Sequence, residues 1–280
     1  MDKLLLVDGS NLLFQMFYGM PSRIVNKAGK PVHGTLGFVG ALLKILKMTK
    51  PTYALVLFDG ESFNPRCDVD AQYKANRPDY SQMPEEETPF SQMSDICAAL
   101  DYLGIKRAET TVCETDDVIA AYALKFGKEM QVAISSFDSD FFQLINENVR
   151  VLRYRGENTV VCDETYLFEK FGITPRQYAD FKSLTGDKAD NVKGVPKVGI
   201  KTAAELLKRF GDLETLSLRL AEVEKPAVRN SLMQSKELLA KNRKLIRLDG
   251  CAELPFPLSE LAFTQVAATT GEVLSAVGIF

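Results

Sequence analysis

Nine carboxylates in five short segments of this 280-residue chain are the side chains best suited to carry out chemistry. The densest group lies in "VCETDDVIAA", where Glu114, Asp116 and Asp117 precede an apolar run with no Lys or Arg among them. The other six follow apolar runs or lie in "TGDKADN": Asp8, Asp59, Asp138, Asp140, Asp187 and Asp190. Oxygen ligands of this kind suit Mg²⁺ or Mn²⁺ rather than zinc.

Each of these acids, taken alone, has an ordinary structural interpretation. An Asp after a strand commonly forms a turn, and Thr115 or Asp116 can cap a helix whose dipole favours acids in its first turn. Nine clustered carboxylates without local cations would, however, be destabilised by mutual repulsion and by loss of water. We therefore expect divalent cations to neutralise them at one shared crevice.

The remaining composition excludes several other chemistries. His33 is the single histidine, which disfavours a His-centred catalytic triad or a zinc site. The five cysteines form no close pair and are typical of buried thiols in a reducing cytoplasm. No apolar stretch is long enough to span a bilayer, and the start "MDKLLLVDG" lacks the features of a secretory signal. We therefore expect a cytoplasmic protein that does not engage a membrane.

The charge distribution matters more than the formal net charge of −3, which alone disfavours a nucleic-acid partner. With the nine acids set aside, 28 acidic residues remain against 34 basic ones, a surplus of six positive charges elsewhere. "YKANRP" places Lys74 and Arg77 beside Tyr73 in a stretch without apolar periodicity. This segment is either a solvated loop or a mobile element that contacts phosphate over the crevice.

"GVPKVGIKTAAELLKRFG" is a second cationic region, over residues 194–211. Gly194 and Gly199 permit tight turns and close backbone approach, and the amides at the start of the following helix can bind a phosphate. This pattern, with Lys201 after it, favours a helix–hairpin–helix that grips the DNA backbone without reading sequence. A simple interhelical turn is the alternative.

The elements that must position these residues alternate between strands and helices. Apolar runs at 3–9, 53–60 and 131–140 each end near an acid and predict strands buried on both faces of a parallel sheet. Helical patterns occupy 34–48, 89–104 and 116–127. We predict a doubly wound α/β domain over residues 1–168, with the crevice at the carboxyl ends of its strands. A helical domain over 169–250 and a tail over 251–280 that packs on the body follow.

The order of motifs along the chain resembles that of the 5′-nuclease, or flap endonuclease, family. The motifs are "VDGSN", "FDG", "YKANRP", "CETDDVIA", "DSDFFQL" and "TGDKADNVKGVPKVGIKTA", over about residues 3–215. The resemblance is nearest to the 5′→3′ exonuclease domain of bacterial DNA polymerase I and its stand-alone relatives. It implies a Rossmann-like, PIN-like nuclease domain with a helical arch around 66–92, plus a helix-3-turn-helix DNA-binding domain whose hairpin lies at 186–210.

The resemblance also implies two Mg²⁺ or Mn²⁺ ions in each active site. The acids that match the first ion are Asp8, Asp59, Glu114 and Asp116. Those that match the second are Asp117, Asp138, Asp140, Asp187 and Asp190. Lys74 and Arg77 match catalytic residues of the arch that approach the scissile phosphate, and Tyr73 matches a residue that stacks on a base.

The hairpin matches the segment that holds duplex DNA in relatives, where K⁺ also binds through backbone carbonyls. Its implied DNA-binding residues are Gly194, Val195, Lys197, Gly199, Lys201 and Thr202. Two positions depart from the pattern: Gln15 stands where many relatives have Arg, and Lys197 stands at a central position that is usually Gly. The first removes a phosphate contact, whereas the second either strengthens electrostatic contact or hinders close backbone approach.

The implied activity is that of a monomeric, structure-specific 5′-nuclease in DNA replication and repair, leaving 5′-phosphate products. Its implied substrates are 5′ flaps, 5′ ends and gapped junctions, RNA-primed ones included. Two alternatives stay open: a catalytically weakened flap- or junction-binding relative, and an unrelated α/β phosphotransferase with Asp8 as nucleophile. The latter usually needs a second acid two residues on, where this chain has Ser10. Whether the chain stands alone or is part of a larger polymerase is also open.

Overall fold

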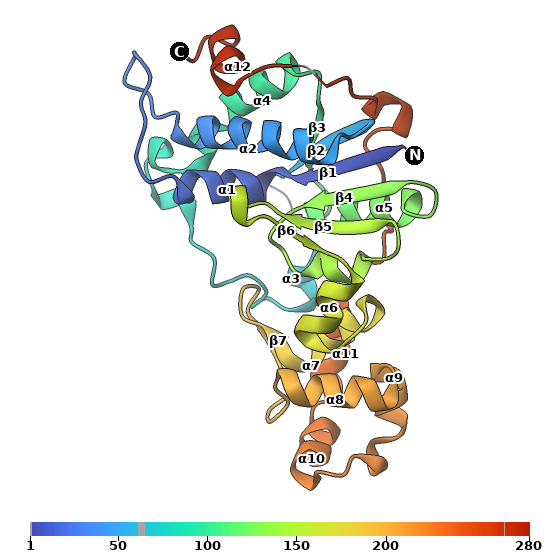
Figure 1. Cartoon of the computed structure of the whole chain (residues 1–280). Helices are drawn as coiled ribbons and strands as arrows, with labels where there is room; N and C mark the ends of the chain where they lie inside the picture. The colour runs from blue at the N-terminus through green and yellow to red at the C-terminus, as the bar shows by residue number, and fades with distance from the viewer. Residues whose placement is uncertain (1, 61–64, 266) are drawn as a thin grey trace.

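A six-stranded sheet forms one end of the molecule, and helices taper away from it (Figure 1). The computed structural model describes residues 2–60, 65–265 and 267–280. The strand order is β3–β2–β1–β4–β5–β6, and all neighbours pair in parallel except β5 and β6. The strands are β1 (Lys3–Asp8), β2 (Tyr53–Asp59), β3 (Lys106–Thr110), β4 (Gln131–Ser135), β5 (Val149–Arg153) and β6 (Val160–Cys162).

The central strands are apolar throughout because both faces of the sheet are covered. In β1, Leu4 and Leu6 belong to one hydrophobic cluster, whereas Leu5 and Val7 belong to the other. Successive side chains of a strand point to opposite faces, so an uninterrupted apolar run fills two cores at once. The predicted buried strands at 3–9 and 53–60 are thus confirmed as β1 and β2, and the run at 131–140 forms β4 in its first half.

Helices cover the two faces of the sheet unequally. One face packs against α1 (Gly9–Gly19), α2 (His33–Thr49), α4 (Met93–Tyr102) and α12 (Thr270–Ala276). The other packs against α5 (Thr115–Phe126) and the start of the helical region. The predicted helices at 34–48 and 116–127 are confirmed, but the one at 89–104 begins later, because residues 89–92 form a 3₁₀ turn. Phe90, within this 3₁₀ turn, is 46% exposed.

Three strands, β3, β5 and β6, carry weaker sequence signals. β3 reads "KRAET" and lies at the edge of the sheet, where polar side chains reach water. β6 has only three residues, and it pairs with β5 in the antiparallel sense. Two further strands of two residues each, β7 (Gly186–Asp187) and β8 (Val192–Lys193), form a hairpin within a region expected to be helical.

The segment 66–92, expected to form a helical arch, contains little regular helix among the described residues. It has α3 (Pro65–Val69) and three 3₁₀ turns, η1 (Tyr80–Gln82), η2 (Glu85–Glu87) and η3 (Pro89–Gln92). Prolines occur at positions 78, 84 and 89, and each lacks the amide that a continuous helix would need. The chain here therefore proceeds in short turns.

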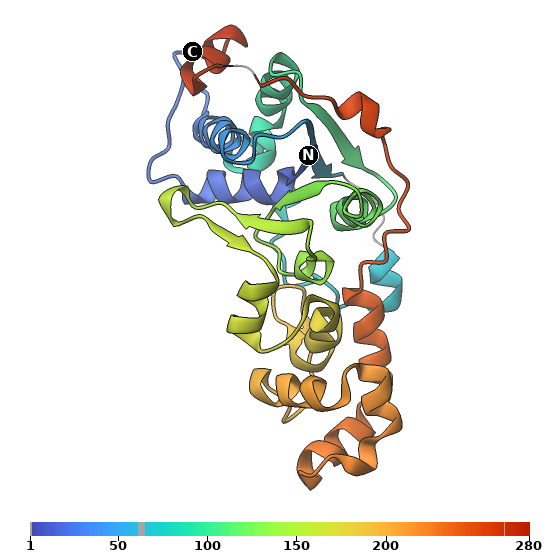
Figure 2. The same ribbon diagram turned by 45° about the vertical axis from the view of Figure 1, so that its right-hand side comes forward.

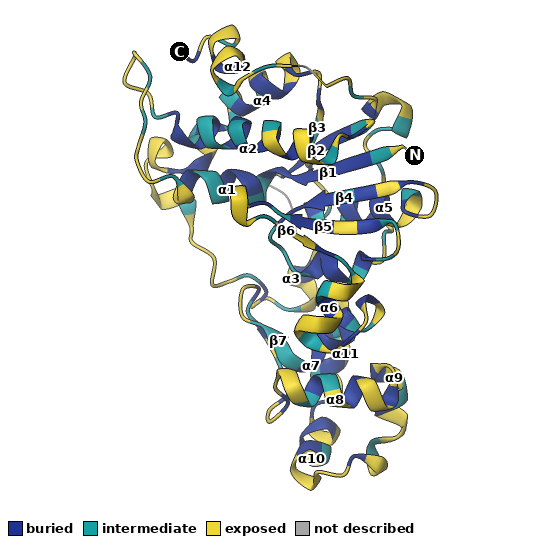
Figure 3. Cartoon of the chain, in the orientation of Figure 1, coloured by how far each residue is buried: buried dark blue, intermediate teal, exposed yellow. Residues whose placement is uncertain are grey.

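The helical region extends below the sheet, and α11 packs against α7 (Figure 2). Its helices are α6 (Glu164–Phe171), α7 (Tyr178–Thr185), α8 (Ile200–Phe210), α9 (Leu213–Leu218), α10 (Pro226–Gln234) and α11 (Lys236–Ile246). Buried residues continue from the sheet along the inner sides of α7 and α8, while the outer side of α8 is exposed (Figure 3). The boundary predicted after residue 168 falls inside α6, and the domain limits stay a prediction.

The last 30 residues return to the sheet. Phe263 donates its amide hydrogen to the Thr52 carbonyl at 2.8 Å, and the Tyr122 hydroxyl donates to the Phe256 carbonyl at 2.7 Å. Val273 and Leu274 of α12 are fully buried against the same cluster as α2 and α4. The tail therefore ties the end of the helical region to the α/β body.

Candidate metal centre

The carboxyl ends of β1 and β2 bring two predicted acids to one edge of the sheet. Asp8 is the last residue of β1 and caps α1, because its carboxylate accepts the Asn11 amide at 3.0 Å. Asp59 is the last residue of β2, and its carboxylate accepts the Thr115 amide at the start of α5, also at 3.0 Å. These contacts place the first turn of α5, with its three acids, beside the ends of both strands.

A chain of hydrogen bonds extends from Asp8 into the segment after β4. The Ser136 hydroxyl donates to Asp8 at 2.8 Å and accepts the Asp138 amide at 3.0 Å. The Asp138 carboxylate in turn accepts the Asp140 amide at 2.8 Å. Ser136, which the sequence analysis did not single out, therefore links Asp8 of β1 to Asp138 in the loop after β4.

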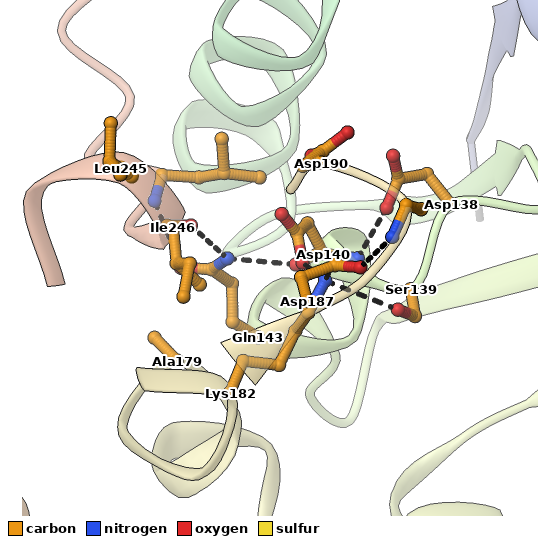
Figure 4. A network of polar contacts seen from close by, with 12 residues as sticks. Asp138, Ser139, Asp140, Gln143, Ala179, Lys182, Asp187, Asp190, Leu245 and Ile246 are labelled. Carbon is orange, nitrogen blue, oxygen red and sulfur yellow. Dashed lines mark hydrogen bonds and ion pairs between the residues drawn. The ribbon is translucent and has the colours of Figure 1, made fainter. Parts of the chain in front are cut away.

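Asp140, Asp187 and Asp190 form the tightest acidic group among the described residues. One oxygen from each carboxylate lies within 4.8 Å of the others (Figure 4). The β7–β8 hairpin delivers the last two, and Gly186, with φ of +77°, makes the turn out of α7. Gly194 lies against this turn so closely that a Cβ there would collide with the Thr185 carbonyl. Carboxylate oxygens are the type of donor that a Mg²⁺-like ion prefers, with water completing its shell.

Among the described residues, Asp8 and Asp116, predicted for the first ion, and Asp138, predicted for the second, lie outside this tight group. Among the described residues, no ion pair involves Asp8, Asp116 or Asp138. Burial raises the pKa of Asp8 to about 7, and repulsion from Asp59 adds to this. Burial, with repulsion from Asp138, raises the pKa of Asp116 well above its usual range. Lys74 acts in the opposite direction on Asp116 but does not outweigh burial and repulsion. Desolvated carboxylates that repel one another are the kind of group that a divalent cation stabilises.

Arg66, on α3, is a cation that the sequence analysis missed. Its guanidinium contacts Glu114 at 2.6 Å and forms two hydrogen bonds with Asp117, at 2.7 and 2.9 Å. Its Nε also donates to the Leu245 carbonyl at 2.9 Å, which ties α3 to α11. Asp117, expected around the second ion, is therefore directed to Arg66 and lies outside the Asp140 group.

Lys74 and Arg77 contact the acidic cluster itself. The Lys74 ammonium forms an ion pair with Glu114, and its backbone adopts φ of +55° while its amide donates to the Asp190 carbonyl. Arg77 lies 3.0 Å from the Asp190 carboxylate, and its side chain is half-exposed. Both cations therefore neutralise acids of the cluster in this structure.

Tyr73 differs from the exposed, base-stacking residue that the resemblance implies. Its side chain is buried and packs with Val192 and Leu245. Its hydroxyl donates to Glu114 at 3.2 Å and lies 3.4 Å from Asp190. The tertiary fold therefore uses its ring in packing, so it supports the acids rather than presenting a surface to a base.

Lys182, on α7, is the second missed cation. Its buried ammonium forms ion pairs with both Asp140 and Asp187. Burial acts to lower the pKa of Lys182, but Asp140 and the acids around it outweigh burial and raise it. The only signal in the sequence is a lone Lys in the otherwise buried helix "YADFKSL".

The expectation of an acidic cluster without local cations was therefore wrong. Four basic side chains, Arg66, Lys74, Arg77 and Lys182, pair with five of the nine carboxylates. Five negative charges remain in excess, which is the charge that divalent ions would neutralise.

The predicted hairpin connects β8 to α8. Lys197 adopts φ of +66°, a left-handed conformation that favours Gly, which is the residue that the resemblance leads us to expect there. Val195 is buried and its amide donates to the Leu184 carbonyl at 2.8 Å, so its side chain faces the core. Lys197 and Lys201 are exposed, whereas Gly199 precedes the first turn of α8 without a side-chain cap. The exposed amides and lysines form a surface suited to phosphate.

Gln15, the other departure from the family pattern, has a structural partner. Its amide donates to the Tyr154 carbonyl at 2.7 Å, which links α1 to the loop after β5. Along the described part of the chain, no helix has the length and hydrophobicity to cross a bilayer.

Two family descriptions together match nearly the whole chain. "5′-3′ exonuclease, N-terminal resolvase-like domain" matches residues 3–172, and "5′-3′ exonuclease, C-terminal SAM fold" matches residues 173–269. The chain belongs to the 5′-3′ exonuclease family. It is 33% identical to a 5′-3′ exonuclease of Aquifex aeolicus over 93% of this chain and 86% of that protein.

The relatives of this chain also include DNA polymerases. The thermostable DNA polymerase I of Thermus thermophilus is 35% identical over 87% of this chain, which spans only 28% of the polymerase. Among solved structures, the T5 D15 protein co-crystallised with metal ions matches with a TM-score of 0.72 at 25% identity, covering 88% of this chain and 89% of that one. T5 5′-exonuclease with bound zinc matches with a TM-score of 0.71 at 25% identity over the same shares of the two chains. The predicted family and the α/β-plus-helical fold class are thereby confirmed.

Proposed function

We propose that this chain is a metal-dependent 5′-nuclease, with 5′→3′ exonuclease and flap endonuclease activity on DNA. The observation that carries the proposal is the group of Asp140, Asp187 and Asp190, whose carboxylate oxygens lie within 4.8 Å of one another in a member of this family. Asp8 and Asp59, at the carboxyl ends of two parallel strands, add to it. The T5 relatives crystallised with divalent metal ions support the use of such ions. Mg²⁺ is the natural choice, because every donor is a carboxylate oxygen.

The acids divide into two candidate ligand sets. Asp8, Asp116 and Asp138, which lack ion pairs among the described residues, would hold one ion, and the group of Asp140, Asp187 and Asp190 would hold the other. When bound, such ions supply positive charge at a phosphodiester and a lowered pKa for attacking water. This chemistry needs no side-chain nucleophile, which suits a chain with one histidine.

The protein's own residues would position the DNA. Lys74 and Arg77 lie against the acids at the edge of the crevice and would move a short distance to offset charge on the scissile phosphate. Lys197, Lys201 and the amides at the start of α8 would hold the duplex backbone, with K⁺ bound at the hairpin. A junction between duplex and a 5′ single strand, RNA-primed or not, is the substrate that spans both sites.

A catalytically weakened DNA-binding relative is the second candidate. The ion pairs between Lys182 and two acids of the tightest group favour it, since a protein cation already contacts part of the second ligand set. The two candidates differ in whether cleavage occurs at all. Cytoplasmic location and a monomeric state complete the proposal for either.

A labelled 5′-flap oligonucleotide separates them. The chain is incubated with the oligonucleotide and Mg²⁺, with EDTA, and as an Asp116→Ala variant with Mg²⁺. Cleavage that requires Mg²⁺ and disappears in the variant supports the nuclease. Metal-independent binding without cleavage would select the weakened relative, and cleavage that survives Asp116→Ala would indicate a contaminant.

A further inference from the structure

Lys182 is a lysine that points from a helix of the DNA-binding region into a carboxylate group suited to metal. Its side chain is only 6% exposed, and its ammonium forms ion pairs with Asp140 and Asp187 (Figure 4). The ammonium also lies 3.5 Å from the Ser139 hydroxyl. Two of the three carboxylates that converge within 4.8 Å therefore already carry a protein cation.

The third carboxylate of this group has a different kind of partner. Asp190 pairs with Arg77, whose side chain is 53% exposed and can rotate into solvent or toward a phosphate. Lys182 has no such freedom, because its side chain is buried and its ammonium is held between Asp140 and Asp187. When a divalent ion binds Asp140 and Asp187, the ammonium of Lys182 must stay nearby, and two cations then share one low-dielectric site.

We infer that Lys182 is a resident counter-ion that competes with the second divalent ion for Asp140 and Asp187. The inference rests on the proposed function and specifies how the second metal position is regulated. Without DNA, the ammonium keeps this position weakly occupied, whereas the site of Asp8 and Asp116, which has no ion pair among the described residues, fills first. A phosphodiester adds negative charge to the shared site, so the second ion binds tightly only with substrate present.

Lys182 is thus a positioning residue, and its effect must appear in metal binding rather than only in turnover. Isothermal titration of the DNA-free full chain with Mn²⁺ measures both sites directly. Lys182→Met removes the charge and keeps most of the side-chain volume, and we expect its second ion to bind about tenfold more tightly. Lys182→Arg keeps the charge and should bind Mn²⁺ as the unaltered protein does.

A matched control removes an ion pair elsewhere. Lys30 pairs with Asp95 at 2.8 Å, outside the acidic cluster, so Lys30→Met should leave both Mn²⁺ affinities unchanged. An unaltered or weaker second affinity in Lys182→Met would overturn the inference. With a non-hydrolysable flap duplex added, the second Mn²⁺ affinity of the unaltered chain should approach that of Lys182→Met. A difference in affinity that the duplex does not reduce would also contradict the inference.

The inference can still be tested if Lys182→Met fails to fold. Lys182→Gln is a second neutral variant whose amide can still donate to Asp140, and it should show the same gain in Mn²⁺ affinity. If both neutral variants unfold without metal, Mn²⁺ should restore their far-UV circular dichroism, and failure to do so would overturn the inference. If the unaltered chain cleaves the flap but the neutral variants bind Mn²⁺ no more tightly than it does, the inference is wrong and the proposed function stands. If the neutral variants bind Mn²⁺ more tightly but the unaltered chain never cleaves, the proposed function is wrong and the inference on metal binding stands.

Discussion

Two neighbouring acids of α5, Asp116 and Asp117, have the same side chain and opposite surroundings. Asp117 forms two hydrogen bonds with Arg66, whereas no ion pair involves Asp116 among the described residues. Replacing water around a buried carboxylate costs free energy, which a fixed cation or a bound ion can offset. The comparison shows that two adjacent acids of the same type have different partners, because only Asp117 forms an ion pair among the described residues. On the proposed function, Asp117 is a structural acid and Asp116 binds metal.

The largest expected effect is on turnover, and it separates these two residues. Asp116→Ala should reduce the rate of flap cleavage at saturating Mg²⁺ by at least about a hundredfold, because a metal ligand is lost. Its thermal stability in EDTA should be retained or rise, since a buried charge without a partner is removed. Asp117→Ala should reduce turnover much less. Equal losses of turnover for the two variants would contradict the division of the acids.

The next effect concerns the protein's own counter-ions. Arg66→Met removes the cation shared by the buried Glu114 and the partly buried Asp117, and leaves Lys74 paired with Glu114. Breaking a buried ion pair on one side lowers the free energy of unfolding by about 3–5 kcal/mol, and urea denaturation in EDTA measures the change. Arg219→Met removes an exposed pair with Glu222 and should leave the free energy of unfolding nearly unchanged, because water already screens that pair. If Arg66→Met changed the free energy of unfolding as little as Arg219→Met does, the acidic cluster would not be desolvated.

A third effect concerns metal removal at different pH values. The pKa of Asp8 rises from 3.8 to about 7 on folding, so the folded protein retains a proton that the unfolded chain has lost. The stability of the metal-free protein should therefore fall as the pH rises from about 4 through about 7. Mg²⁺ replaces that proton, and we expect it to raise the melting temperature by a few °C more at pH 8 than at pH 6. Differential scanning calorimetry with and without EDTA tests this, and a larger Mg²⁺ effect at pH 6 would contradict it.

Much of the site was predictable because its acids follow from local rules. Asp8 and Asp59 end apolar runs, and parallel strands must bring their carboxyl ends to one edge. The cations were harder to predict, because nothing local distinguishes a Lys that points into a carboxylate group from one in water. Lys182 reaches Asp140 across 42 residues of chain, and only tertiary packing decides that contact.

The arch and its aromatic residue show the other limit of sequence analysis. The prolines that interrupt the segment 66–92 were visible, but the family resemblance favoured a helix there. The burial of Tyr73 depends on α11, more than 160 residues later in the chain, which contributes Leu245 and Ile246 to its packing. A pattern with no apolar periodicity around position 73 could not indicate this.

The smallest expected effect is on DNA binding by Lys201, which follows the hairpin and forms no ion pair with the acidic cluster among the described residues. Lys201 is exposed in the first turn of α8, and a phosphate held there would release counterions from DNA. Lys201→Ala should weaken duplex binding at low salt and reduce the slope of log K against log[salt] by about 1, with turnover of the bound complex unchanged. Lys125→Ala, in the last turn of α5, is the control and should change neither quantity. Fluorescence anisotropy over a salt series measures the slope, and an unchanged slope in Lys201→Ala would remove α8 from the DNA contact surface.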